Sequence, residues 1–148
     1  MEYVDITFNG IEKKYIDYFV KCVMNIDCSK IVNSHFYTNE RGDFEYYDDI
    51  DLKEYFSDNR TCNILLSGLR FNTEYGNVLV IITSNEQDID ITVNIEYDRF
   101  MPSLTKKFIT ELEQLFFKFQ LKCITVISTI DNNPILIIDS KGTLCSYN

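Results

Sequence analysis

Alternation of apolar and polar residues is the clearest pattern in the chain, and it is most regular from Ile89 to Tyr97. In that segment, apolar residues at every odd position alternate with polar or acidic residues at every even position. A period of two is typical of a β-strand that has one buried and one solvated face. The same pattern or β-rich composition predicts further strands at 4–8, 35–38, 44–47, 62–71, 78–83, 124–130 and 135–138.

Two longer segments carry apolar residues at helical spacing. One extends from Ile11 to Ile26 after the cap-like residue Asn9, and the other begins at Pro102 and extends to Phe119. Charged residues lie opposite the apolar stripe in each, so the sequence predicts two long amphipathic helices. A short helix is predicted after Asp51, whose side chain can cap it.

Together these elements predict the order β-α-β-β-(short α)-β-β-β-α-β-β. Consecutive strands joined by short turns, with helices between groups of strands, indicate the α+β class. We therefore expect a single domain over residues 1–148, built from a single antiparallel or mixed β-sheet with two long amphipathic helices packed on one face. The pattern does not determine the order of the strands in the sheet.

The charge of the chain narrows the choice of partners. It has 14 Lys and Arg against 23 Asp and Glu, which gives a net charge of −9. Such a field repels nucleic-acid phosphate and anionic lipid and attracts basic proteins. We expect a protein partner and neither nucleic acid nor a membrane, although negative charge also serves solubility alone.

The cysteines and the N-terminus indicate a cytoplasmic protein. The five cysteines show no C-x-x-C pair and fall mostly in apolar stretches, which predicts reduced, buried thiols. The first residues contain no basic segment followed by an apolar run, and no apolar stretch approaches the length of a membrane span.

Candidate catalytic chemistry is sparse. His35 is the only histidine, no nucleophile motif surrounds a Ser or Cys, and no glycine-rich phosphate loop occurs. We therefore predict neither an enzyme nor a cofactor. The carboxylate pairs Asp49 with Asp51 and Asp88 with Asp90 could hold Mg²⁺, and the alternative is that they are solvated surface groups.

One segment combines aromatic rings with a dense run of carboxylates, from Asp43 to Asp51. Tyrosine offers large, stiff contact area, and carboxylates pair with Lys and Arg of a partner. In the alternative interpretation, Phe44 and Tyr46 point into the core and the charges only solvate the hairpin. The predicted partner-binding residues are Asp43, Glu45, Tyr47, Asp48, Asp49 and Asp51, with a second acidic patch at Asp90, Glu96 and Asp98.

With this size, acidic charge, α+β pattern and Tyr/Asp segment, the chain resembles the bacterial immunity proteins that neutralise polymorphic or contact-dependent toxins. The segment Asp43 to Asp51 is similar in character to the acidic, tyrosine-bearing surfaces of colicin-type immunity proteins, although those proteins are helical. The resemblance implies a cytosolic inhibitor that binds and occludes a cognate toxin domain, basic and of nuclease type. The sequence does not determine whether the chain is a monomer or a dimer.

Two other interpretations stay open at this point. The chain could be a regulatory or structural interaction module without catalysis. It could also be a small Mg-dependent hydrolase or transferase that uses one of the two carboxylate pairs.

Overall fold

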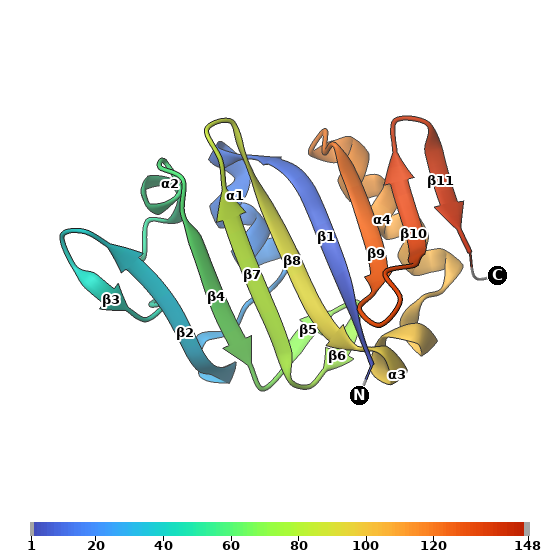
Figure 1. Ribbon diagram of the computed structural model, residues 1–148, viewed down its shortest axis with the longest axis horizontal. Coiled ribbons are helices and arrows are strands. Elements are labelled where there is room, and N and C mark those ends of the chain that lie inside the picture. The colour runs from blue at the N-terminus through green and yellow to red at the C-terminus, as the bar shows by residue number, and fades with distance from the viewer. Residues whose placement is uncertain (1, 147–148) are drawn as a thin grey trace.

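A nine-stranded β-sheet forms the body of the protein in the computed structural model, which describes residues 2–146 (Figure 1). All neighbouring strands of this sheet are antiparallel, in the order β11-β10-β9-β1-β8-β7-β4-β2-β3. The strands are β1 (Tyr3–Glu12), β2 (Ile31–Thr38), β3 (Gly42–Phe44), β4 (Thr61–Leu66), β7 (Val78–Ser84), β8 (Asp88–Glu96), β9 (Cys123–Ser128), β10 (Pro134–Asp139) and β11 (Gly142–Cys145).

The helices α1 and α4 cover one face of the sheet and leave the other face open toward the viewer (Figure 1). Alternate residues of the central strands are therefore buried, and the odd-numbered residues Ile89 to Ile95 of β8 are fully buried as predicted. The ring of Phe19 packs edge-on against Phe8 of β1 at 5.4 Å and against Phe119 at 5.1 Å. These contacts join the helices to the sheet in one core. The α+β class and the antiparallel sheet are confirmed.

The first predicted helix is much shorter than its apolar pattern suggested. Ile11 and Glu12 belong to β1, and the helical turns that follow are 3-10 (Lys13–Tyr15), α1 (Ile16–Tyr18) and a π-type turn (Phe19–Val23). The pairing of β1 with β8 shifts register between Phe8 and Ile11, which marks a bulge. Gly10 lies there with φ +87°, and its N–H donates to Asp90 Oδ1 at 2.9 Å. The bulge lets the strand continue through residues predicted to be helical.

The second predicted helix begins later than Pro102. A short α3 (Tyr97–Phe100) and a 3-10 turn (Met101–Ser103) come first, and α4 spans Lys106–Lys118. The Oγ1 of Thr105 accepts a hydrogen bond from the Phe108 N–H at 3.2 Å and caps the helix. The predicted pair of long helices is therefore wrong, since within residues 2–146 α4 alone is a long amphipathic helix, and it buries Phe108, Leu112 and Phe116.

The predicted single sheet is also wrong, because the predicted strand 62–71 is broken after Leu66. β5 (Leu69–Phe71) leaves the main sheet and pairs with β6 (Thr73–Tyr75) in a separate two-stranded sheet. The predicted hairpins β2–β3 and β9–β10 and the short helix α2 (Leu52–Tyr55) are present, and the tail adds the strand β11. The strand predicted at 44–47 is misplaced, because β3 pairs with β2 over Gly42–Phe44 and ends at Phe44.

The thiols and the helix lengths bear on two further predictions. No disulfide joins any of the five cysteines, but only Cys62 is buried and Cys22 is exposed, so the expectation of buried thiols is wrong for the others. None of the helices in residues 2–146 has the length and apolar character needed to cross a bilayer.

Candidate partner-binding surface

The acidic segment Asp43–Asp51 begins in the hairpin at the β3 edge of the sheet. Phe36 of β2 lies opposite Phe44 of β3, and Thr38 lies opposite Gly42, which adopts φ +70°. The Oγ1 of Thr38 accepts a hydrogen bond from the Arg41 N–H at 3.1 Å. This contact and the left-handed glycine close the hairpin and fix the direction in which the segment leaves it.

A cluster of aromatic rings anchors the segment to the core. Fully buried Phe36 lies 5.6 Å from Phe44, 6.0 Å from Tyr46 and 4.9 Å from Tyr55 between ring centroids. Phe44 and Tyr46 are partly buried against this core, as their inward interpretation predicted. Burial raises the pKa of Tyr46 to about 12. Tyr47 instead faces solvent and is 41% exposed.

The predicted carboxylates of this segment are all exposed, but three of them have partners within the protein. Asp43 Oδ1 lies 2.8 Å from His35 Nε2, Asp48 Oδ1 accepts from Cys28 Sγ at 2.8 Å, and Asp51 Oδ1 accepts from the Glu54 N–H at 3.0 Å. Each of these contacts engages one carboxylate oxygen and leaves the other for a further partner.

The contact with Asp48 changes the acidity of a thiol. Partial burial, and then the hydrogen bond and negative charge of Asp48, raise the pKa of Cys28 from 9.0 to about 11. The thiol therefore stays protonated at neutral pH and donates a hydrogen bond to the carboxylate of Asp48.

Arg41 is a cation inside this acidic surface that the sequence did not single out. Its guanidinium lies 4.0 Å from the centre of the Phe44 ring, and its Nη1 donates to the Tyr47 hydroxyl at 3.0 Å. Arg41 thereby holds the exposed ring of Tyr47 in a defined orientation.

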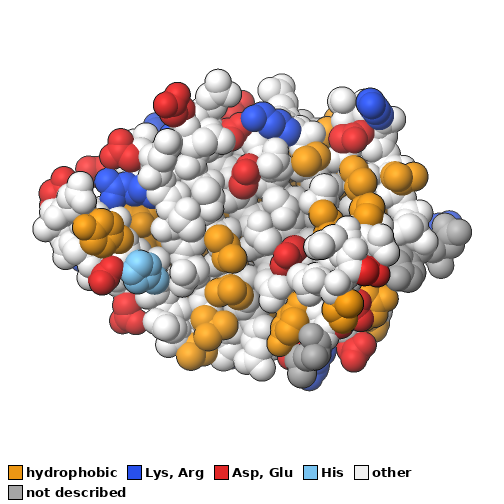
Figure 2. Space-filling view, viewed as in Figure 1, with side chains coloured by type: hydrophobic (Ala, Val, Ile, Leu, Met, Phe, Trp, Pro, Cys, Tyr) orange, Lys and Arg blue, Asp and Glu red, His pale blue; other side chains and the backbone are white. Residues whose placement is uncertain are grey.

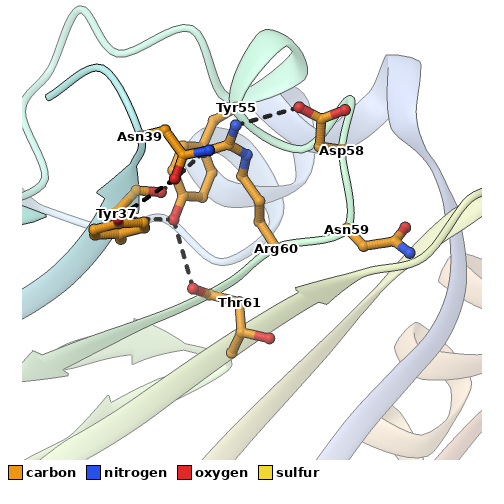
Figure 3. Close-up of a pocket in the computed structure, with 7 residues that line it drawn as sticks. All are labelled: Tyr37, Asn39, Tyr55, Asp58, Asn59, Arg60 and Thr61. Carbon is orange, nitrogen blue, oxygen red and sulfur yellow. Dashed lines mark hydrogen bonds and ion pairs between the residues drawn. The ribbon is translucent and has the colours of Figure 1, made fainter. Parts of the chain in front are cut away.

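Two neighbouring cavities lie beside this surface and share Tyr55, Asp58 and Arg60. Their volumes are about 420 and 440 Å³. The first is lined by Tyr37, Asn39, Tyr55, Asp58, Asn59, Arg60 and Thr61, which are drawn in Figure 3. The sequence did not predict these lining residues, because they come from β2, α2, β4 and the loops between them and meet only in the folded chain.

Arg60 is held in place at these cavities by three kinds of contact. Its Nη1 donates to the Tyr37 carbonyl at 2.9 Å, its Nη2 pairs with Asp58 at 3.2 Å, and its guanidinium lies 5.2 Å from the centre of the Tyr55 ring (Figure 3). The Tyr55 hydroxyl accepts from the Tyr37 N–H at 3.1 Å. The lining is thus a fixed polar and aromatic concavity next to Tyr47.

The second predicted acidic patch lies elsewhere and is not continuous. Asp90 and Glu96 are half-buried on β8, but Asp98 lies in α3 because the strand ends at Glu96, so its predicted place on the strand face is wrong. Three strands separate β8 from β3, which corresponds to about 19 Å at the usual strand spacing. The two predicted patches are therefore separate surfaces.

The carboxylate pairs considered for Mg²⁺ have other roles in the structure. Asp88 is buried and forms an ion pair with Lys122 at 2.9 Å, and although burial opposes it, this pair and Asn85 lower the pKa of Asp88. Asp51 caps α2. Among residues 2–146, no group of three or more His, Cys, Asp or Glu side chains is placed to hold a metal ion.

The open face of the sheet is mostly uncharged in Figure 2, and its acidic side chains are unevenly spread. Several of them gather at the left margin, where β2 and β3 lie, and others are scattered over the rest of the face. Apolar side chains form a small group near the middle of the view.

Comparison with solved structures shows the same fold in a bacterial complex. The chain matches one chain of the crystal structure of the toxic C-terminal tip of CdiA from Pseudomonas aeruginosa in complex with immune protein, with a TM-score of 0.69 and 9% sequence identity. The match covers 93% of this chain and 95% of the other. At this identity the likeness shows a shared fold. The comparison with curated proteins gives no match.

A family model gives the more specific result. The model described as PABL017 Cdi1I immunity protein matches residues 2–137 of the chain. The class of protein is therefore that of the contact-dependent immunity proteins, as the resemblance predicted. Within that class, the chain belongs to the PABL017 Cdi1I immunity protein family.

Proposed function

We propose that this protein acts in the cytoplasm as an inhibitor that binds and occludes its cognate toxin domain through the acidic surface Asp43–Asp51. The observation that carries the proposal is the exposed run of carboxylates and Tyr47 in a segment whose Phe44 and Tyr46 pack against the core. A rigid surface of this kind loses little conformational freedom when a partner binds.

The surface offers two kinds of contact to a cationic partner. Glu45 and Asp49 are exposed, and within residues 2–146 their side chains form no ion pair. Tyr47, held by Arg41, supplies stiff contact area of the kind that dominates protein interfaces. The carboxylates accelerate the encounter with a basic domain and then form ion pairs with it.

A basic toxin of nuclease type fits this charge best. Nuclease domains carry cationic surfaces for phosphate, and a chain with a net charge of −9 can cover such a surface without making or breaking a bond. Asp90, Glu96 and Asp98 belong to the same proposal as a second, separate contact.

The test is a binding measurement with the toxin domain encoded beside this gene, using the double variant Asp48→Lys with Asp49→Lys. We expect the complex to weaken by about 2 kcal/mol or more, which is about thirtyfold in Kd. We also expect the variant to lose part of the salt dependence of the wild-type complex. Titration calorimetry at several salt concentrations measures both quantities.

A matched control is Glu86→Lys with Glu111→Lys, which changes the net charge equally at positions outside the acidic surface. It should keep wild-type affinity to within a few-fold. If the two double variants bind the toxin domain equally well, the acidic surface is not the contact.

A further inference from the structure

A cavity of about 610 Å³ lies next to the acidic surface and has the opposite character. It opens between the turn that contains residues 25–30, the β5–β6 hairpin, the flanking glycine turns and α3. Three cationic side chains line it: Lys30, Arg70 of β5 and Arg99 of α3. They come from separate parts of the sequence, so only the fold brings them together.

None of these three cations forms an ion pair within the described residues. Among residues 2–146, no carboxylate lies within 4.0 Å of Lys30, Arg70 or Arg99, whereas Arg60 and Lys122 both have ion pairs. The chain has only four arginines, and two of them line this cavity. In an acidic protein this is a local concentration of available positive charge.

The two acidic residues of the lining offset only part of that charge. Asp27 Oδ1 accepts from the Ser29 N–H at 2.9 Å and from its hydroxyl at 2.8 Å, and these hydrogen bonds, with a smaller contribution from the charge of Lys30, lower the pKa of Asp27. Glu74 lies opposite Arg70 in the β5–β6 register without forming an ion pair. The donors of all three cations remain available to a ligand.

The walls of the cavity leave room for a flat anionic group. Gly68 and Gly76 contribute no side chain, and a Cβ at Gly68 would lie 3.8 Å from Lys30 Cδ and from the Tyr75 carbonyl. The aliphatic part of Lys30 thus lies close to the backbone at Gly68. The planar guanidinium groups of Arg70 and Arg99 suit carboxylates, because a guanidinium can bind a carboxylate through two parallel hydrogen bonds.

The cavity and the acidic surface share one structural element. The 3-10 turn Cys28–Lys30 contacts Asp48 through the Cys28 thiol at 2.8 Å and lines the cavity with Lys30. The Lys30 carbonyl also accepts from the Ser67 N–H at 2.8 Å, which fixes this turn to the loop before β5. The negative and positive regions are therefore neighbours on one continuous surface.

We propose that this cavity binds carboxylate side chains of an acidic segment on the same partner protein whose cationic face meets Asp43–Asp51. The inference rests on the proposed function and adds a second contact of opposite sign. Two neighbouring regions of opposite charge define a single orientation of the partner, because a reversed complex would place like charges together. Nucleic acid fits the cavity less well, since the net charge of −9 repels a long polyanion.

The cavity can be tested alone with a hexaglutamate peptide as the probe and the full chain labelled for NMR. We expect the peptide to shift the amide resonances of Gly68 and Gly76. In the variant Arg70→Glu with Arg99→Glu, the affinity for the peptide should fall by about tenfold or more. The control Lys106→Glu with Lys107→Glu has the same net charge and should bind as the wild type does. An unchanged thermal midpoint shows that each variant is folded.

Three results would overturn the assignment. They are no shift at the two glycines, equal loss of affinity in the control, and binding of a short RNA oligonucleotide or inorganic phosphate in the absence of hexaglutamate binding. Because the peptide titration needs no toxin, failure there overturns the cavity alone. Failure of the wild-type chain to bind the toxin domain overturns the proposed function instead.

Discussion

The acidic surface and the basic cavity lie on either side of the turn Cys28–Lys30, yet their charges are held in different ways. In the acidic surface, Asp43, Asp48 and Asp51 each have a hydrogen-bond partner in the protein, and Phe44 and Tyr46 pack against the core. In the cavity, none of the three cations has an ion pair within the described residues. Substitutions of Asp43, Asp48 or Asp51 should therefore change stability as well as binding, whereas substitutions in the cavity should change binding alone.

Removal of the buried ring beneath the acidic surface should have the largest effect. Phe36 is fully buried among Phe44, Tyr46 and Tyr55, so Phe36→Ala loses its apolar contacts and leaves a cavity. The expected loss in the free energy of unfolding is about 3–5 kcal/mol. Denaturant unfolding measures it. Tyr37→Ala, at a neighbouring ring that is 49% exposed, should cost clearly less, and equal losses would contradict the anchoring role of Phe36.

The capping carboxylate should have an intermediate effect. Asp51 accepts a hydrogen bond from the Glu54 N–H at the start of α2, so Asp51→Ala should destabilise the protein by about 1 kcal/mol. Asp49→Ala is the matched control, because Asp49 is exposed and its side chain forms no ion pair in the described residues. Thermal unfolding of the two variants separates a structural carboxylate from one available to a partner. If both variants unfold at the wild-type temperature, the cap does not contribute to stability.

The smallest effect concerns the thiol that joins the two regions. The pKa of Cys28 is raised to about 11, first by burial and then by Asp48. Asp48→Asn should lower this pKa toward 9.0 without reaching it, because burial remains. Alkylation of Cys28 near pH 9 should then be faster in the variant, as read by mass spectrometry with exposed Cys22 as the internal reference. An unchanged rate would show that Asp48 does not act on the thiol.

The raised pKa of Cys28 also determines the direction in which pH changes the stability of the folded state. A thiol whose folded pKa lies above its unfolded value of 9.0 favours the folded state at lower pH. This contribution is fully present below pH 9.0 and is lost as the pH rises through about 11.

Much of the fold could be predicted wherever the local pattern and the final environment agree. The unbroken alternation of β8 and the hairpin from β9 to β10 are present, and so is the short helix α2 with its Asp51 cap. The inward positions of Phe44 and Tyr46 were also predicted correctly, although β3 ends at Phe44 and Tyr46 follows the strand. Each of these features is decided by residues close together in the sequence.

The errors came from contacts between distant residues. The apolar positions from Ile11 onward fit a helix, but the bulge at Gly10, stabilised by Asp90 far along the chain, carries β1 through Glu12. The apolar run 62–71 fits one strand, but the chain turns at Ser67, whose N–H bonds the Lys30 carbonyl. No local pattern contains this information.

The candidate sites differ in the same respect. The acidic surface is one continuous run of residues and could be found in the sequence, although its place in the interface is still a prediction. The basic cavity combines Lys30, Arg70 and Arg99, which only the folded chain assembles. The sequence does show that the chain has only four arginines, but this count does not predict that two of them lie close together in the fold.

The position of β1 in the sheet has a consequence for synthesis of the protein on the ribosome. β1 lies between β8 and β9, so Thr7 meets Thr92, 85 residues later, and Glu2 meets Ser128, 126 residues later (Figure 1). The pairing of β1 with β9 therefore cannot be completed until translation has passed Ser128, and such non-local pairing is slow. A nascent chain arrested before β9 leaves one edge of β1 without its partner in the sheet.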